Sequence, residues 1–583
     1  MRIILPMLAC ISLAVVVLTV TQSLLAQETQ KALALQDYQK AGQLDPLPAN
    51  TASLYRTPWR SNVRTASAAE AIEGVGVYYK HLGADENVMK QMSQAGVKRL
   101  RLAPHHSMYI HKDWTGPSPE EAKNLDGEMK YSKAAGIRPC VAFIHIPPQG
   151  KGDEMSKWMK RDWNKGLMPL GEGKPGDEEY DAYMEKLWLG LKAILDSAKA
   201  NGFTAEGSYD IEIGCNLWWG APAMPPNPAL TLEMLRKGGQ VYEASKALIA
   251  RARKEGYKEP TFWNGQSHHL FDQMTDDEMF PGAVGRAISF YHPMGGVTGK
   301  DFTGSDPWPQ RKPLQFAEGT PPDGLTLCKP ESYAADFSRH DNLIGLLKSG
   351  RKVSITSLGV VPSEIPGLMV ETADANGKTV RVKAQGVDGW AIKSKGLTRT
   401  YAFWLNQGAS FVLIHSAYEG ANDEMSHALI PNFGKNPEAF KWQQSRPLAT
   451  LKDFLSPLQS AKKLDKLTDL KFKYALAQDS ELIAKSPKGG PLMASDAVAI
   501  LPFQVSKKKF AVACYVVTPD ISKAYKGTLM TLQVDKKIKG DAAIARPVEH
   551  KTAKATLIES KADATTLAFP VTDDVTWVVF EIE

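Results

Sequence analysis

Histidine is concentrated at the ends of short apolar segments of this sequence. The chain has 12 histidines, and nine of them follow segments that read as buried β-strands: His81, His105, His106, His111, His145, His268, His269, His292 and His415. Imidazole titrates near neutral pH, donates and accepts hydrogen bonds, and binds metals. Such a cluster indicates a polar site that binds a ligand or moves a proton.

The spacing of these histidines does not favour a metal centre. No two of them have the HxH or HExxH spacing that presents two imidazoles to one ion. In the adjacent pairs, His105-His106 and His268-His269, neighbouring side chains are expected to diverge. A metal site stays the less favoured alternative, and we expect neither a bound metal nor an organic cofactor.

Carboxylates and aromatic side chains occupy the same positions. The candidate catalytic residues are Glu212, in the fourth apolar segment, and Glu419 and His292, which follow the eighth and sixth segments. Aromatic faces stack on sugar rings, while histidine and asparagine bind hydroxyl groups, so this mixture favours a carbohydrate ligand. The residues expected to bind it are Arg101, His105, His106, His145, Asn216, Trp218, Trp219, Trp263, His268, Tyr291 and His415.

These residues need an architecture that brings many strand ends together. From Gly74 onward, eight apolar segments alternate with amphipathic helices; the expected strands are Val75–Tyr79, Val97–Leu102, Ile137–Ile146, Asp210–Ile213, Thr261–Trp263, Ala287–Tyr291, Val353–Thr356 and Phe411–His415. This alternation favours an α/β fold, a (β/α)8 TIM barrel with its functional groups at the C-terminal strand ends. A doubly wound sheet is the alternative, but no glycine-rich phosphate loop follows any strand.

The rest of the chain divides around this barrel. We expect a signal peptide at 1–26, a linker segment at 27–70, the barrel at 71–458 and an all-β sandwich at 459–583, where two-residue alternation replaces the helical period. An inserted β-hairpin is expected within 367–396, with strands that include Trp390–Ile392. It would lie over the barrel mouth as a lid or subsite wall.

Two strand ends resemble motifs of the clan A glycoside hydrolases. Residues 211–216, Ile-Glu-Ile-Gly-Cys-Asn, are similar to a Glu-Ile-Gly-Asn-Glu motif, and residues 355–359, Ile-Thr-Ser-Leu-Gly, to Ile-Thr-Glu-Leu-Gly. In that family each motif carries a catalytic glutamate, whereas the matching positions here hold Asn216 and Ser357. Arg101 matches the second-strand arginine, which in the family supports the nucleophile.

The resemblance implies a barrel-plus-sandwich protein that acts on a poly- or oligosaccharide. Retaining hydrolysis needs two carboxyl groups about 5–5.5 Å apart, and neither Asn216 nor Ser357 supplies one. The leading hypothesis is therefore a glycoside hydrolase with relocated catalytic groups, and the alternative is an inactive glycan-binding protein. Glu212 either forms a structural ion pair with Arg101 or acts in a rearranged site.

Composition and the N-terminal sequence limit the possible partners and the location of the protein. Of the 583 residues, 43% are hydrophobic and 23% charged, and the net charge is +6 without a dense basic stripe, which disfavours a nucleic-acid partner. The apolar stretch 3–20 followed by Ala26-Gln27 predicts a cleaved signal and a secreted or periplasmic protein with no membrane span; without cleavage it would be an anchor. A purely structural role is disfavoured by the histidine cluster.

Overall fold

The structure is a computed structural model that describes most of the chain. The described residues are 35–41, 51–52, 63–79, 85–102, 115–143, 176–214, 237–267, 279–289, 297–298, 315–316, 326–327, 330–331, 352–418, 423–432, 436–477, 498–518 and 520–583.

A closed barrel of eight parallel strands forms the centre of the molecule. In barrel order the strands are β4 (Val75–Tyr79), β5 (Arg99–Leu102), β6 (Arg138–Phe143), β7 (Tyr209–Ile213), β8 (Pro260–Ser267), β9 (Gly285–Ser289), β13 (Lys352–Leu358) and β16 (Val412–His415). All eight expected strands are present, so the predicted TIM barrel is confirmed. β8 runs four residues beyond its expected end. The added residues, Asn264–Ser267, are polar and show no apolar alternation, so the sequence did not predict them as strand, but they pair with β9.

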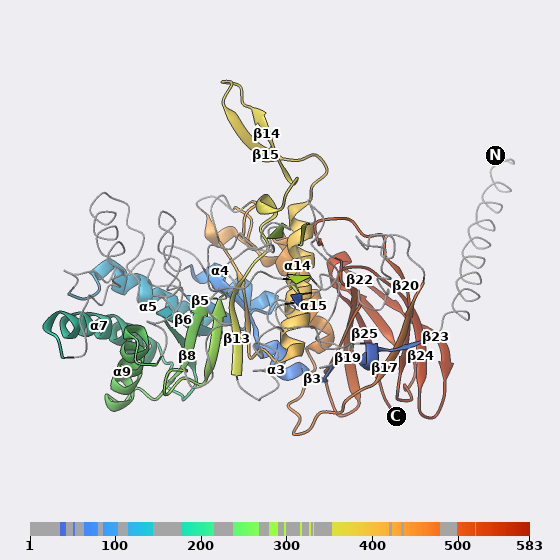
Figure 1. Ribbon diagram of the computed structural model, residues 1–583, viewed down its shortest axis with the longest axis horizontal. Coiled ribbons are helices and arrows are strands. Elements are labelled where there is room, and N and C mark those ends of the chain that lie inside the picture. Colours follow the sequence, from blue (N-terminus) through green and yellow to red (C-terminus); the bar gives the residue numbers. More distant parts are fainter. Residues whose placement is uncertain are drawn as a thin grey trace.

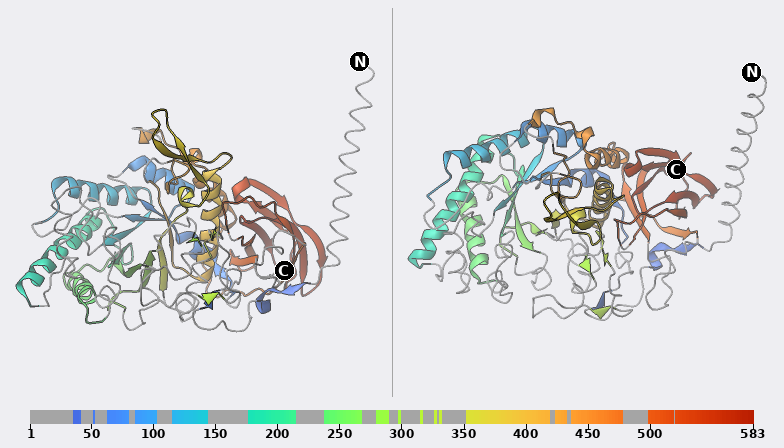
Figure 2. Two further views of the ribbon diagram at one scale, coloured as in Figure 1. Left: turned by 45° about the horizontal axis from the view of Figure 1, so that its top comes forward. Right: turned by 90° about the horizontal axis from the view of Figure 1, so that it is seen from above.

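Helices cover the outside of the barrel (Figures 1 and 2). They are α4 (Glu86–Ala95), α5 (Pro119–Ala134), α7 (Glu178–Ala200), α9 (Gln240–Lys254), α14 (Gly389–Gln407) and α15 (Arg446–Leu455). Local signals set their ends: the Asp85 carboxylate accepts a hydrogen bond from the backbone N–H of Val88 at the start of α4, and Gly96 ends that helix at a φ of 109°. Within the described ranges, no helix is both long and apolar enough to cross a membrane.

The inserted hairpin is shorter than expected. Its strands are β14 (Met369–Ala373) and β15 (Thr379–Lys383), whereas the third expected piece, Trp390–Ile392, belongs to α14. The helix begins there because the Asp388 side chain accepts a hydrogen bond from the backbone N–H of Ala391 and caps its first turn. The hairpin projects away from the body of the molecule (Figure 1), and most of its side chains are exposed, which does not fit the expected lid.

Two sheets form the predicted C-terminal β-sandwich, and all their strand pairs are antiparallel except β3 with β18, which are parallel. One has the order β1-β17-β20-β24-β23 and the other β22-β21-β25-β19-β18-β3. Their bounds are β1 (Gln36–Asp37), β3 (Ala66–Ser67), β17 (Phe472–Leu476), β18 (Val498–Gln504), β19 (Lys509–Val516), β20 (Thr528–Val534), β21 (Ala543–Arg546), β22 (Lys551–Lys554), β23 (Thr556–Ser560), β24 (Thr565–Val571) and β25 (Thr576–Glu581). β1 and β3 come from the expected linker segment 27–70, so this segment contributes a strand to each sheet.

Small elements complete the described chain. Two helices precede the barrel, α2 (Tyr38–Ala41) and α3 (Ala68–Glu73). Two-residue strands pair as β2 (Thr51–Ala52) with β11 (Gln315–Phe316), and as β10 (Val297–Thr298) with β12 (Thr326–Leu327).

A buried ion pair joins the barrel to the sandwich. The Arg399 guanidinium on α14 donates to both carboxylate oxygens of Glu331, at 3.2 and 2.7 Å, and neither side chain is exposed. The Tyr515 hydroxyl of β19 donates to the same carboxylate at 2.6 Å. One carboxylate therefore holds together a barrel helix and a sandwich strand, and α14 and α15 lie between the two domains (Figure 1).

Removal of Glu331 should destabilise the protein strongly. Glu331→Ala leaves the Arg399 charge buried without its carboxylate, and breaking such a pair typically costs about 3–5 kcal/mol. Urea unfolding would measure this loss. The control is Glu559→Ala on β23, whose ion pair with Lys561 is exposed and whose loss should cost less than about 1 kcal/mol. Equal losses for the two variants would contradict the prediction.

Candidate functional site

Polar side chains occupy the lower interior of the barrel. Asp210 on β7 accepts hydrogen bonds from Arg138 at 2.6 Å and from the Trp263 indole N–H at 2.9 Å, and it forms an ion pair with Arg99. Trp263 is only 3% exposed and packs among other interior side chains. It was expected to offer an exposed face to a ligand, but strand alternation directs it into the barrel, where its polar edge binds Asp210.

A second ion pair lies above this layer. Arg101 Nε donates to Glu212 Oε2 at 2.8 Å, and the Thr356 hydroxyl donates to Glu212 Oε1 at 2.9 Å. Both charged side chains are completely buried. The guanidinium carbon of Arg101 also lies 4.8 Å from the centre of the Tyr78 ring. Each oxygen of Glu212 thus accepts a hydrogen bond, and the carboxylate is held in one orientation.

A β-bulge in β13 lies beside this pair. The pairing register of β13 shifts against both neighbouring strands between Ile355 and Leu358, so Thr356 and Ser357 together face a single residue of β16. Ser357 is fully buried, and its hydroxyl has no hydrogen-bond partner within the described part of the chain. Ser357 therefore lies next to Thr356, the residue whose hydroxyl donates to Glu212.

Two imidazole rings lie next to each other on the β16 side of this ion pair. The His415 ring lies 4.8 Å from the Tyr78 ring and 4.7 Å from the His427 ring, in a T-shaped arrangement with the latter. His415 is 2% exposed, whereas His427 is half-buried. His427 was not among the predicted site residues, because it lies 12 residues beyond the strand. The apolar run Ala428-Leu429-Ile430, whose backbone pairs with Ser416 and Ala417 just after β16, is the signal that could have found it.

A tyrosine pair packs at the same end of the barrel. Tyr418 lies 5.6 Å from Tyr79 in an edge-on contact, and the Tyr79 hydroxyl accepts a hydrogen bond from the backbone N–H of Asp85. Burial raises the pKa of both phenols above the usual range, so both remain protonated. Tyr418 is 5% exposed. It therefore packs with Tyr79 and offers little ring surface to a ligand.

The structure thus brings together part of the predicted site. We use the name upper interior layer for five residues from five strands: Tyr78, Arg101, Glu212, Thr356 and His415. Ten other predicted site residues lie outside the described residues, and their roles stay predictions: His105, His106, His145, Asn216, Trp218, Trp219, His268, Tyr291, His292 and Glu419. Among the residues that the structure does describe, no three metal-binding side chains gather at one point.

The effects of Arg101 and Glu212 on the free energy of unfolding should depend on each other. Arg101→Met leaves a buried carboxylate without its counter-ion and should cost about 3–5 kcal/mol of unfolding free energy. Adding Glu212→Leu should recover much of that loss, because the uncompensated charge is then gone. Denaturant unfolding of the single and double variants measures both effects.

The control for this experiment is Arg251→Met on α9. Arg251 pairs with Glu185 at the surface, where the two side chains are 36% and 60% exposed, so its loss should cost less than about 1 kcal/mol. A double variant that is less stable than Arg101→Met alone would show that the two residues do not compensate each other.

No family model matches the sequence, and no curated protein sequence is significantly similar to it. Several solved structures with a similar fold are glycoside hydrolases. A family 30 subfamily 8 xylanase, Xyn30A from Clostridium acetobutylicum, is 11% identical, with a TM-score of 0.45 over 91% of this chain and 100% of its own. An endo-1,4-β-D-mannanase from Thermotoga petrophila RKU-1 is 10% identical, with a TM-score of 0.32 over 65% and 98%. A family 5 lichenase from Caldicellulosiruptor sp. F32 is 8% identical, with a TM-score of 0.35 over 70% and 99%. At these values the similarities carry nothing about what this chain binds.

Proposed function

We propose that this chain is an exported carbohydrate-active protein that binds a poly- or oligosaccharide at the barrel mouth, the end formed by the C-terminal strand ends. Glycoside hydrolysis is the activity that we favour. TIM barrels place their functional groups at this end, on loops that rigid strands position.

One observation carries this proposal. The interior of a TIM barrel is usually filled by bulky branched apolar side chains. Here the upper interior layer instead contains a guanidinium, a carboxylate, a hydroxyl, a phenol and an imidazole. Because the interactions of Glu212 and His415 fix this layer, it offers a preorganised polar floor to a ligand above it.

Hydrolysis then requires carboxylates other than Glu212. Both oxygens of Glu212 already accept hydrogen bonds from side chains, which suits a positioning role better than proton transfer to a sugar oxygen. In the hydrolase hypothesis, Glu419 supplies the missing carboxylate and His292 assists proton transfer. This assignment rests on their positions after the eighth and sixth strands.

A glycan-binding protein without hydrolytic activity is the second candidate. It is favoured by the buried Ser357 hydroxyl at the position that matches a family glutamate, because serine cannot replace the second carboxyl group of a retaining hydrolase. The same binding residues serve both candidates, and only Glu419 and His292 would differ in role.

Glycan binding and glycan turnover are tested separately. A glycan array followed by calorimetry identifies a ligand of the wild type, and Trp218→Ala should then weaken binding by about 5- to 150-fold, the equivalent of about 1–3 kcal/mol for a lost stacking contact. Lys508→Ala, in the turn between β18 and β19, is the control and should leave affinity unchanged. If no glycan binds the wild type, the carbohydrate proposal fails.

Turnover distinguishes the two candidates. Release of reducing ends from the bound glycan should be abolished by Glu419→Gln while the affinity is retained, if the protein is a hydrolase. No release by the wild type, with binding intact, would establish the glycan-binding protein.

The proposed export of the protein can be tested separately. The mature protein should begin at Gln27, because the apolar stretch 3–20 and Ala26 form a cleavable signal. N-terminal sequencing of the protein from the culture medium or periplasm checks this. A chain that starts at Met1 and remains with the membrane would establish an uncleaved anchor instead.

A further inference from the structure

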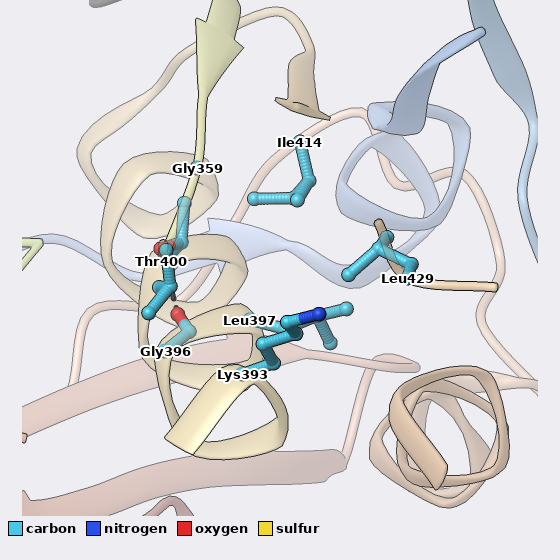
Figure 3. Close-up of a pocket in the computed structure, with 8 residues that line it drawn as sticks. Gly359, Lys393, Gly396, Leu397, Thr400, Ile414 and Leu429 are labelled. Carbon is cyan, nitrogen blue, oxygen red and sulfur yellow. Dashed lines mark hydrogen bonds between the residues drawn. The ribbon is translucent and has the colours of Figure 1, made fainter. Parts of the chain in front are cut away.

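A lysine is buried behind the upper interior layer. Lys393, in the second turn of α14, is 1% exposed and lines a cavity of about 10 Å³, the size that one water molecule needs. Figure 3 shows its side chain running past Leu397 toward Leu429, with Ile414 of β16 on the far side of the cavity. The lysine lies between the helix and the segment that follows β16.

The ammonium group binds both ends of one short segment. Lys393 Nζ donates to the backbone carbonyl oxygen of Asp423 at 2.8 Å and to that of Ala428 at 2.6 Å. It also lies 4.2 Å from the centre of the Trp390 ring, one turn earlier on α14. Because the two carbonyls are five residues apart, a single side chain spans the turn between them.

This segment, residues 423–430, carries His427, and we call it the return segment. Its end pairs with the chain just after β16: the backbone N–H groups of Leu429 and Ile430 donate to the carbonyls of Ser416 and Ala417, at 2.9 and 3.2 Å. This pairing brings the His427 ring against His415, 4.7 Å between centres. The orientation of His427 thus depends on the path of the return segment.

Other contacts of the return segment come from the start of α15, where the Ser445 hydroxyl donates to the carbonyl of Leu429 at 2.6 Å, and from the base of the hairpin. Glu424 accepts a hydrogen bond from the backbone N–H of Gly389 at 3.0 Å and pairs with Lys383 of β15. The carbonyl of Met425 accepts from the backbone N–H of Ser363 at 3.0 Å. These contacts hold one side of the turn. Among the described side chains, Lys393 alone binds both the Asp423 carbonyl and the Ala428 carbonyl, at the two ends of the turn.

We infer that Lys393 is a positioning residue of the proposed glycan site, which fixes the return segment so that His427 lies against His415. This inference rests on the proposed function only in assigning the imidazole pair to a glycan site. The contact between Lys393 and the return segment exists without any ligand, so it is testable on the free protein.

The charge state of Lys393 adds a second observable. Burial lowers its pKa to about 7, while the carboxylates of Asp423 and Glu424 act in the opposite direction. The unfolded chain therefore binds a proton that the folded chain lacks between about pH 7 and the ordinary lysine value of 10.5. Stability should rise with pH across this window in the wild type, and this contribution should be absent from Lys393→Met.

The experiment uses Lys393→Met in the full chain, with histidine labelled at the imidazole carbons. Methionine keeps an unbranched chain of similar length but donates no hydrogen bond. We expect the NMR signals of His427 and His415 to shift and the His427 signal to broaden, with both signals assigned through His427→Gln and His415→Gln. If a glycan ligand is known, its affinity should fall at least about fivefold.

Lys395→Met is the matched control. Lys395 lies two residues away on α14, but its Nζ binds Asp573 of the sandwich at 2.8 Å. The control removes a half-buried ammonium from the same helix and should leave both histidine signals unchanged. Lys393→Arg, which restores hydrogen-bond donors, should return the signals toward the wild type.

Unchanged His427 and His415 signals in folded Lys393→Met would overturn the inference, as would equal shifts in Lys395→Met. If Lys393→Met does not fold, Lys393→Gln replaces it, with the same two outcomes. If the shifts occur but no glycan binds the wild type, the positioning role stands and the proposed function fails.

Discussion

The structure depends on two carboxylates that one strand directs into the barrel. Asp210 and Glu212 lie two residues apart on β7, so both face the interior, where an unpaired charge would cost several kcal/mol. β5 meets them with two arginines at the same spacing, Arg99 and Arg101. The strand between them, β6, places Arg138 beside Arg99 and Cys140 beside Arg101, and Arg138 also donates to Asp210.

This arrangement explains why the candidate site is rigid and also why its chemistry is restricted. The Glu212 carboxylate pairs with Arg101 and accepts from Thr356, so both of its oxygens are already engaged by side chains. The imidazole pair of His415 and His427 lies beside this layer, at the end of β16.

Much of the fold could be predicted from the sequence, because alternation of apolar residues and glycine turns marks the barrel strands directly. The prediction failed where polar residues form regular structure. Asn264–Ser267 extend β8 without an apolar pattern, and α14 begins at Gly389 because Asp388 caps it. The Arg101–Glu212 ion pair was one of the two roles expected for Glu212, since alternation places both residues inside the barrel. The place of His427 could not be predicted, because it depends on tertiary hydrogen bonds from the return segment to the residues just after β16 and to α14.

The short strands β1 and β3 give the chain an unusual order of assembly. β1 pairs with β17 and β3 with β18, across more than 430 residues of intervening sequence in each case. During synthesis the whole barrel leaves the ribosome before either strand meets its partner, so both sheets close last and through contacts of very high sequence separation. The N-terminal segment is therefore not a dispensable tether. A truncated chain that begins at the barrel would expose the backbone edges of β17 and β18, which invite pairing with other chains.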